Sequence, residues 1–316
     1  MRIVYVMDPF STVNVDKDTT FAFMLEAQQR GHDNYFVEIK DLYVKEGKAY
    51  GRVKPVKVQR VQSAPAELGP EERLPLSVFD AVLMRKDPPF DMDYIFATYI
   101  LDHAGPKTYV GNRPSGIRDS NEKMAILRFT EVIVPTLVTK DQRLLKEFLH
   151  EQSGQMIIKP LDGRGGDGIF LIKEGDRNIN SLFETMTLNG ARYIMAQRYI
   201  PEVRTGDKRV IIIDGEAVGG LWRIPAEDDN RANMHVGGVG AKANLDERDL
   251  KIAEVIRPYL KANGLDFVGV DVIGGYLTEI NVTSPTGVQE ISRFNGIDLA
   301  AMTIDMVEHR VKALQG

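Results

Sequence analysis

The chain has 316 residues, of which 43% are hydrophobic and 27% charged, so it is long enough for two or three compact lobes. A formal net charge of −5 and a pI of about 5.7 exclude a broad basic surface for nucleic acid or an anionic membrane. The absence of cysteine excludes disulfides, thiolate nucleophiles and cysteine-based metal centres. The first apolar run reaches Asp8 too soon for a signal peptide, and no later run is long enough to span a bilayer. We therefore expect a cytoplasmic protein without nucleic-acid or membrane partners.

The first segment predicts a parallel sheet. Residues 3–7 read as a strand, 18–30 as a helix and 35–39 as a second strand, which together form a βαβ unit. A small hairpin, 42–44 with 49–53, is expected next, followed by an exposed loop as far as Pro75.

A strand at 79–84, a helix at 91–103 and a short strand at 108–110 complete this first segment. The pattern predicts an open α/β domain over residues 1–118. Asp119 and Glu122 have the spacing of a capping box, which predicts a helix from there through Phe129.

The remaining elements predict a mixed α+β part rather than a second doubly wound sheet. The expected strands are 156–161, 169–173, 193–197, 208–213, 217–224, 267–273 and 277–282, and the expected helices are 179–186, 247–263 and 299–314. Asp214-Gly215 is a strong signal for a hairpin turn between two of these strands.

Four glycines lie within seven residues at 162–168. Consecutive backbone N–H groups of such a loop can surround a phosphate, because glycine has no Cβ and tolerates positive φ. The loop runs from strand to strand, whereas the Walker loop and the dinucleotide-binding loop run from strand to helix, so both of these are disfavoured. A plain mobile hairpin is the alternative. Lys159, on the entry strand, favours phosphate binding because it adds an ammonium group.

A second signal is the acidic pattern in residues 267–282. Side chains alternate between the faces of a strand, so Glu279 and Asn281 share one face. The position of Asp271 depends on the intervening turn. A two-residue turn at 274–275 would place it on the face of Ile280, whereas a three-residue turn would place it opposite Glu279.

Burial favours the three-residue turn. In that register one face is formed by the apolar residues Val268, Val270, Val272, Ile280 and Val282. Asp271, Glu279 and Asn281 then face each other on the opposite side, where two carboxylates repel unless a cation separates them. A solvated acidic face is the alternative. The apolar reverse face and the upstream glycine loop favour a magnesium site with hard oxygen ligands.

Arginines lie between these two signals. Asp207 and Arg209 share a face of one predicted strand, and Arg223 lies on the strand that pairs with it. Arg231 and Asn233 follow in a loop. Guanidinium groups match phosphate and carboxylate oxygens, so we expect several of these arginines to face a polyanion. Arg85, after a first-domain strand, is compatible with either a ligand contact or a solvated charge pair at a prolyl turn.

This order of motifs resembles the ATP-grasp superfamily. Within it, the sequence is similar to bacterial glutathione synthetases over essentially the whole chain. The segments that carry this resemblance are Val6–Pro9, Met84–Asp91, Ile158–Gly163, Gly206–Val210 and Leu277–Thr286. The resemblance implies an N-terminal open α/β (pre-ATP-grasp) domain at 1–118. A two-lobed ATP-grasp domain would follow, with the small lobe at 119–198 and the C-terminal lobe at 199–316.

The resemblance also implies a reaction and a set of site residues. The family joins γ-glutamylcysteine to glycine through an acyl phosphate, converting ATP to ADP and phosphate. The implied ATP-binding residues are Lys123, Lys159, Gly163, Arg164, Gly165, Gly166, Asp167, Gly168, Gln197, Tyr199, Ile200, Asp207, Arg231 and Asn233. Asp271, Glu279 and Asn281 would hold two magnesium ions, with manganese as an alternative metal. Arg209 and Arg223 would be catalytic, and Arg85, Asp207, Ser284 and Thr286 would contact the peptide or glycine.

Arg164 and Asp167 occupy loop positions where small or apolar residues are expected for the family, and Thr286 is followed by Gly287. Another ATP-grasp ligase, for an amino acid or D-alanine, is an alternative, as is a non-catalytic nucleotide-binding regulator. No metal ligand or key arginine is missing, which disfavours the regulator. The family further implies a homotetramer.

Overall fold

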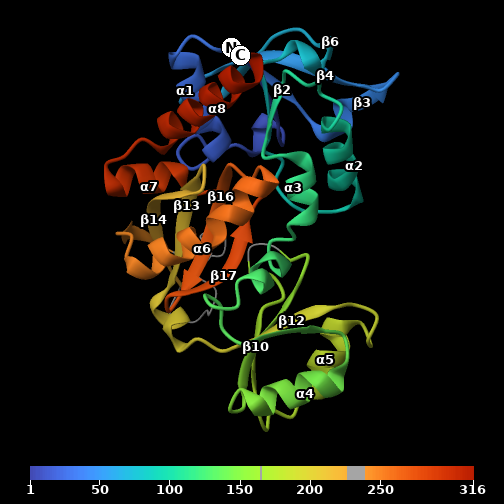
Figure 1. Cartoon of the computed structure of the whole chain (residues 1–316), viewed down its shortest axis with the longest axis vertical. Coiled ribbons are helices and arrows are strands. Elements are labelled where there is room, and N and C mark those ends of the chain that lie inside the picture. The colour runs from blue at the N-terminus through green and yellow to red at the C-terminus, as the bar shows by residue number, and fades with distance from the viewer. Residues whose placement is uncertain (164–165, 226–238) are drawn as a thin grey trace.

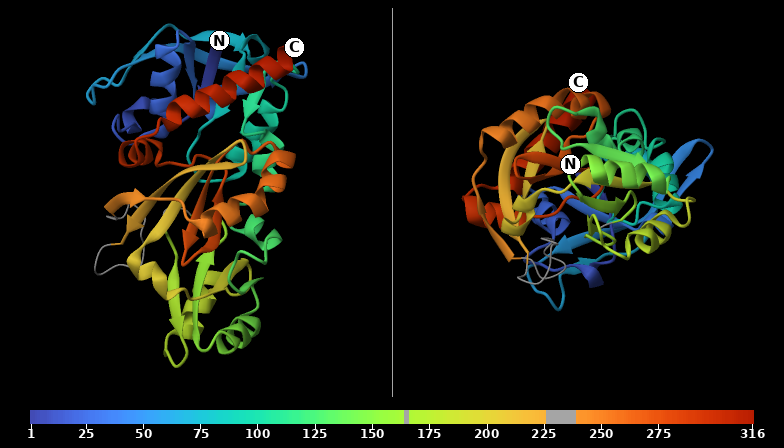
Figure 2. Two further views of the ribbon diagram at one scale, coloured as in Figure 1. Left: turned by 60° about the vertical axis from the view of Figure 1, so that its left-hand side comes forward. Right: turned by 90° about the horizontal axis from the view of Figure 1, so that it is seen from below.

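The computed structural model describes residues 1–163, 166–225 and 239–316. Its elements form three lobes arranged along the longest axis of the molecule (Figure 1). The N-terminal lobe lies at one end, together with the last helix, α8. The small lobe, which carries the glycine-rich loop, lies at the other end, and the five-stranded sheet of the C-terminal lobe lies between them. Both termini lie at the same end (Figures 1 and 2).

The N-terminal lobe contains an eight-stranded sheet with the order β3-β4-β2-β1-β7-β8, to which β5 and β6 add by pairing with β4. Its strands are β1 (Arg2–Val6), β2 (Asp33–Val37), β3 (Leu42–Lys45), β4 (Lys48–Val58), β5 (Ala66–Leu68), β6 (Glu72–Pro75), β7 (Ala81–Met84) and β8 (Tyr109–Gly111). The pairs β1–β2, β1–β7 and β7–β8 are parallel, as the βαβ pattern predicts.

The prediction of an exposed loop as far as Pro75 was wrong. β4 continues to Val58, and β5 and β6 return to pair with it. The polar composition reflects an extended ribbon whose residues are mostly exposed or half-buried rather than a loop.

Helices cover both faces of this sheet. They are α1 (Thr19–Gln29), α2 (Met92–Leu101) and α3 (Pro114–Asp119), joined from the far end of the chain by α8 (Leu299–Gln315). Short 3-10 turns lie at η1 (Phe10–Thr12), η2 (Ile39–Asp41) and η3 (Leu76–Val78). Asp18 begins α1 by accepting a hydrogen bond from the Phe21 amide at 2.7 Å, and Asp91 begins α2 by accepting one from the Tyr94 amide at 3.0 Å.

The predicted capping box at Asp119 was also wrong. Asp119 is the last residue of α3, and the segment from Ser120 to Phe129 forms the 3-10 turn η4 (Met124–Arg128) in place of the predicted helix. The Glu122 carboxylate does not cap its own segment. It accepts hydrogen bonds from the backbone of Val282 and Thr283 instead, so a tertiary contact replaces the local cap.

The small lobe is a four-stranded antiparallel sheet, β11-β10-β12-β9, with two helices. Its elements are β9 (Thr136–Thr139), α4 (Gln142–Glu151), β10 (Gln155–Pro160), β11 (Phe170–Lys173), α5 (Ile179–Thr187) and β12 (Ile194–Arg198). The glycine-rich loop connects β10 to β11, which confirms the prediction that it runs from strand to strand.

The C-terminal lobe is an antiparallel sheet with the order β15-β14-β13-β16-β17. Its elements are η5 (Pro201–Thr205), β13 (Asp207–Ile213), β14 (Glu216–Ile224), β15 (Val239–Ala243), α6 (Glu247–Asn263), β16 (Phe267–Ile273), β17 (Tyr276–Asn281) and α7 (Val288–Asn295). The Asp214-Gly215 turn joins β13 to β14, as predicted. Among the helices described, none combines the length and apolarity needed to cross a bilayer.

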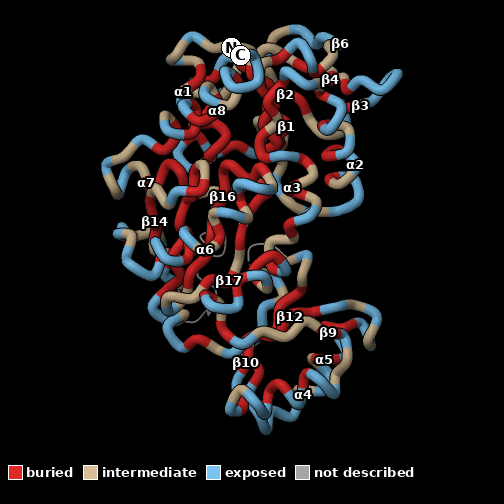
Figure 3. Tube along the Cα trace, viewed as in Figure 1, coloured by how far each residue is buried: buried red, intermediate tan, exposed pale blue. Residues whose placement is uncertain are grey.

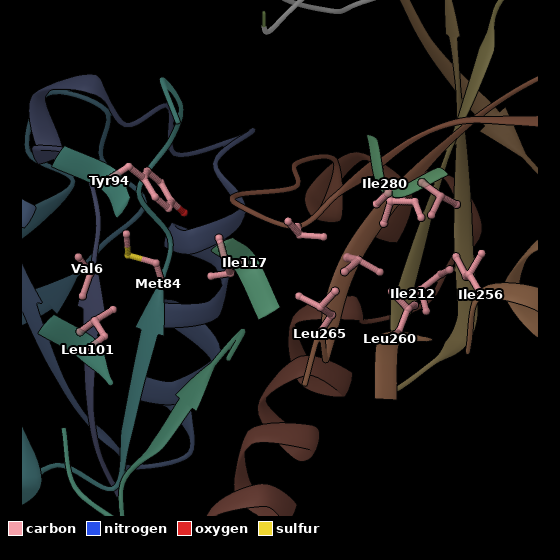
Figure 4. Close-up of a cluster of buried hydrophobic side chains, with 14 of the residues drawn as sticks. Val6, Met84, Tyr94, Leu101, Ile117, Ile212, Ile256, Leu260, Leu265 and Ile280 are labelled. Carbon is pink, nitrogen blue, oxygen red and sulfur yellow. The ribbon is translucent and has the colours of Figure 1, made fainter. Parts of the chain in front are cut away.

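The N-terminal and C-terminal lobes share their hydrophobic cores. One buried cluster runs from Val6 and Met84 through Ile117 of α3 to Leu265 and Ile280 (Figure 4). A second cluster, on the opposite faces of both sheets, combines α1 with α7 and α8. The core of the small lobe is a separate cluster that includes Leu145, Ile158 and Phe183. Burial follows the central strands, whereas much of α4 and β3 is exposed (Figure 3).

Candidate active site

The acidic hairpin β16–β17 has the predicted pairing, reached by a different turn. Asp271 lies opposite Glu279, and Gly269 lies opposite Asn281. The turn itself contains two residues, because Ile273 pairs with Tyr276. A bulge at Asp271/Val272 restores the register, so the three-residue turn was wrong and the position of Asp271 was right.

Thr278 is the extra residue that makes the bulge. Its hydroxyl donates to the Asp271 carbonyl at 3.0 Å, while its own carbonyl accepts from the Lys159 ammonium at 3.1 Å. The bulge therefore joins the acidic hairpin to the strand that enters the glycine-rich loop. The predicted apolar face is confirmed, since Val268, Val270, Val272, Ile280 and Val282 are all buried in one cluster.

Two arginines enclose the Asp271 carboxylate. Arg209 Nε lies 2.5 Å from Asp271 Oδ1, and Arg223 Nη2 lies 3.0 Å from Oδ2. Arg223 also binds Asp207 through two hydrogen bonds, of 2.5 and 2.7 Å. The strands bring these four side chains together because Asp207 pairs with Arg223 and Arg209 pairs with Asp271. The predicted arginine cluster is thus a buried network on one face of the sheet.

This network keeps Asp271 ionised. Burial raises the pKa of its carboxyl, but the guanidinium groups of Arg209 and Arg223 lower it more, so the pKa lies well below its usual range. The opposing carboxylate keeps the pKa of Arg223 above its usual value despite burial. The two guanidinium groups are therefore held in fixed positions by the carboxylates of Asp207 and Asp271.

Lys123 links the glycine-rich loop to the acidic hairpin. Its ammonium group donates to the Gly163 carbonyl at 2.7 Å and to Glu279 Oε1 at 2.9 Å. Lys159 is also buried, with its ammonium group against the hairpin. The pKa of Lys159 is lowered to about 8, mainly by burial; the Glu279 charge opposes this shift and the Lys123 charge adds to it.

The described part of the glycine-rich loop has a backbone that requires glycine. Gly166 and Gly168 have φ of 87° and 72°, in the left-handed region. A Cβ at Gly163 would lie 2.6 Å from the Pro160 ring, so this position is closed to other residues for a different reason. Asp167 lies in the turn between these glycines. Arg164 and Gly165 lie outside the described residues, as do Arg231 and Asn233 of the second predicted loop.

Three of the predicted ATP-binding residues lie at the junction between the small lobe and the C-terminal lobe. Gln197, in β12, is buried and donates to the Thr136 hydroxyl at 3.0 Å. Tyr199 and Ile200 follow after Arg198, and the Tyr199 hydroxyl is buried with no hydrogen-bond partner among the residues that the structure describes. A buried hydroxyl of this kind needs a partner, which a bound ligand could provide.

The predicted peptide-side residues meet where the N-terminal and C-terminal lobes touch. Arg85 follows β7 and is buried, and it donates to the Pro285 carbonyl at 3.0 Å. The Ser284 hydroxyl donates to the Arg85 carbonyl at 3.2 Å. Arg209 donates a hydrogen bond from Nη1 to the Thr286 carbonyl at 3.4 Å. The segment 284–286 therefore connects Arg85 to the arginine network.

Sequence reasoning missed two residues of this region, Glu122 and Thr278. Glu122 was assigned to a cap, although it lies next to Lys123, and that neighbour was the available signal. Thr278 gave no signal, because a bulge depends on both strands at once.

The donor set fits a cation that also binds phosphate. Asp271 and Glu279 contribute carboxylates, and the Asn281 amide nitrogen donates to the Gly269 carbonyl at 3.0 Å, which leaves its oxygen for a metal. Across 1–163, 166–225 and 239–316, no group of three or more histidine, cysteine, aspartate or glutamate side chains is arranged to hold a metal ion. A metal ion here would need further oxygen ligands besides these side chains, such as water or phosphate oxygens.

An antiparallel small lobe with a glycine-rich loop, set against a sheet that carries Asp…Glu-x-Asn and two buried arginines, defines a protein of the ATP-grasp class. The family models agree. The N-terminal domain of prokaryotic glutathione synthetase matches residues 1–118, and the ATP-grasp domain of the same family matches residues 122–296. The chain belongs to the prokaryotic glutathione synthetase family.

Curated relatives support this assignment over the full length. A glutathione synthetase from Vibrio parahaemolyticus is 45% identical over 314 residues, covering 99% of each chain. Those from Mesorhizobium japonicum and Salmonella typhimurium are each 46% identical and cover 99% and 98% of this chain, respectively, and 99% of the relative.

Solved structures show the same fold at low sequence identity. The crystal structure of D-cycloserine synthetase DcsG superposes with a TM-score of 0.70 at 16% identity, covering 98% of this chain and 99% of the other. A RimK domain ATP-grasp protein from Sphaerobacter thermophilus gives 0.63 at 19% identity, with coverage of 98% and 100%.

Proposed function

We propose that this protein joins the cysteinyl carboxyl group of γ-glutamylcysteine to the amine of glycine, using ATP, and so produces glutathione, ADP and phosphate. Membership in the family gives the substrates. The observation that carries the chemistry is the convergence of Lys123 and Lys159 with Arg209, Arg223 and the Asp271–Glu279 pair. Cations from two lobes meet there around one pair of carboxylates.

The reaction has two steps. A carboxylate oxygen of the peptide attacks the γ-phosphorus of ATP, ADP leaves, and an acyl phosphate forms. The glycine amine then attacks the acyl carbon, loses a proton, and phosphate leaves. Negative charge develops first on the transferred phosphoryl group and then on the acyl oxygen. Arg209 and Arg223 are fixed in a buried network and are therefore suited to stabilise both.

The nucleotide site on this proposal lies between the small lobe and the C-terminal lobe. Lys123 and Lys159 bind its phosphates beneath the loop, and adenine lies against the 197–200 junction. The remaining residues of this site are Gly163, Arg164, Gly165, Gly166, Asp167, Gly168, Asp207, Arg231 and Asn233. Residues 1–118 contribute the peptide side, 119–198 the loop, and 199–316 the catalytic sheet.

Asp271, Glu279 and Asn281 would hold magnesium, two ions in our proposal, with manganese as a substitute. The metal would neutralise phosphate charge during transfer. Arg85, Asp207, Ser284 and Thr286 would bind the peptide or glycine. As the family resemblance implies, we further propose a cytoplasmic homotetramer.

Phosphate release from ATP tests the proposed function. We expect turnover with γ-glutamylcysteine and glycine, and little with D-alanine in place of glycine. Turnover with D-alanine but not with glycine would contradict the substrate assignment. No turnover with either amine would favour a non-catalytic nucleotide-binding regulator. Glu279→Gln should fold normally and lose turnover, because an amide replaces a metal-binding carboxylate; full activity would contradict the metal site.

A further inference from the structure

The segment that joins the two family domains makes contacts that the proposed function does not explain. We call residues 120–123 the linker segment. The Ser120 hydroxyl lies 2.6 Å from the Tyr259 hydroxyl of α6, and the Asn121 amide donates to the Leu161 carbonyl, at the entry to the glycine-rich loop, at 3.1 Å. Lys123 holds both the loop and Glu279. Three of its four residues therefore contact α6, the glycine-rich loop and β17.

The fourth residue, Glu122, forms hydrogen bonds with the chain at the end of β17. Its Oε1 accepts hydrogen bonds from the Val282 amide at 2.9 Å, the Thr283 amide at 3.1 Å and the Thr283 hydroxyl at 2.8 Å. Its backbone carbonyl accepts from the Ile280 amide at 2.9 Å. Glu122 thus binds the chain immediately before and immediately after Asn281.

Within the described part of the chain, Asn281 is the proposed metal ligand that no cationic side chain contacts, and these four bonds fix the backbone on both sides of it. Asp271 is held by two arginines and Glu279 by Lys123. Asn281 has only the bond from its amide nitrogen to Gly269 among the contacts described. β17 is also an edge strand of its sheet, so its outer side lacks a neighbouring strand, and Glu122 occupies part of that side.

We infer that Glu122 is a positioning residue that sets the Asn281 oxygen for the metal and so raises the metal affinity of the site. This inference rests on the proposed function, because it assumes the metal site of the family. A carboxylate suits the role, since one charged oxygen can accept three donors at once. Outer partners of metal ligands commonly change metal affinity by ten- to a hundredfold when removed.

The test measures Mn²⁺ binding directly, by electron paramagnetic resonance of free Mn²⁺, with a non-hydrolysable ATP analogue present. Glu122→Ala should weaken Mn²⁺ binding by about tenfold or more. Glu122→Gln keeps an oxygen that can accept from the same amides, so it should recover most of the affinity. Glu131→Gln, at an exposed glutamate nearby, is the matched control and should bind as the parent protein does.

A purely structural role would lower the melting temperature without changing Mn²⁺ affinity. Wild-type affinity in folded Glu122→Ala would therefore overturn the inference while leaving the proposed function intact. If Glu122→Ala does not fold, Thr283→Val removes the hydroxyl donor to Glu122, and an unchanged Mn²⁺ affinity in that folded variant would overturn the inference equally. No Mn²⁺ binding by the parent protein would contradict the metal site itself.

Discussion

Lys159 lies one residue before the end of β10, with its ammonium group buried against the Thr278 carbonyl. Its pKa is about 8, lowered mainly by burial. The charge that binds phosphate is therefore present below pH 8 and is lost as the pH rises through 8. Folding stability has the opposite dependence. The folded pKa is below the unfolded value of 10.5, so the cost of burying the charge is largest below pH 8 and disappears towards pH 10.5.

The first prediction concerns nucleotide affinity. Because only the protonated form of Lys159 attracts phosphate, the dissociation constant of ATP should rise by about tenfold between pH 7 and pH 9. Titration calorimetry at half-unit pH steps measures this change. In Lys159→Arg the charge persists at every pH tested, so its profile should be flat, whatever its absolute affinity. A flat profile in the parent protein would contradict the role of Lys159.

Among the elements, the hairpin β16–β17 shows how far the sequence could predict the site. Alternation of polar and apolar residues was sufficient to put Asp271 opposite Glu279, because the wrong pairing would expose a row of valines. The alternation could not reveal how that pairing is reached. A two-residue turn with a bulge and a three-residue turn give the same register at Asp271. They differ in the Ile273–Tyr276 pair and in the contacts of Thr278, one of which is with Lys159 of β10.

The linker segment shows the opposite case. Asp119 and Glu122 have the spacing of a local cap, and local patterns describe only neighbours in the sequence. Here the Glu122 carboxylate accepts hydrogen bonds from residues about 160 positions away, beginning at Val282.

Helix α4 was missed for a different reason. Asp141 begins it, and Leu145, Phe148 and Leu149 are its buried residues, so the signal was present in the sequence.

The second prediction separates backbone strain from loop function. Gly168 and Gly175 both have positive φ, of 72° and 87°. A Cβ at Gly168 would lie 3.2 Å from the Pro160 ring, whereas a Cβ at Gly175 would have no atom within 4 Å. The positive φ alone should make alanine cost about 1 kcal/mol at either position, and the Pro160 contact should add to this cost at Gly168. Only Gly168→Ala should also raise the KM for ATP, by about tenfold, because it shifts the phosphate-binding loop. Equal KM values in the two variants would contradict the assignment of the loop.

At the scale of the whole molecule, the distribution of the cores determines which parts unfold together. Two buried clusters each combine the N-terminal lobe with the C-terminal lobe, and α8 packs against α1 at the end of the chain. Arg30, at the C-terminus of α1, adds an ion pair to this contact, with its Nη1 2.6 Å from Oδ1 of Asp305 in α8. These two lobes are therefore expected to unfold as one unit. The small lobe, which has its own core, is expected to unfold separately.

Calorimetry of two matched variants tests this expectation. Ile304 of α8 and Leu145 of α4 are both fully buried, the first in the shared core and the second in the small-lobe core. Each change to alanine should cost about 2–5 kcal/mol. Ile304→Ala should lower the melting temperature of the larger transition, and Leu145→Ala only that of the smaller one. Equal shifts of a single transition would show that all three lobes unfold together.

The nucleotide should couple the two transitions. On the proposed function it contacts Lys159 in the small lobe and the acidic hairpin in the C-terminal lobe, so it binds only when both are folded. An ATP analogue with Mg²⁺ at a hundred times its dissociation constant adds about 2.7 kcal/mol to whichever unit unfolds first. We expect the small lobe, whose core is the smaller one, to unfold first, so its transition should move up towards the larger one. In Gly168→Ala, measured at the same ligand concentration, the upward shift should be smaller, because the loop that joins ligand to lobe is displaced.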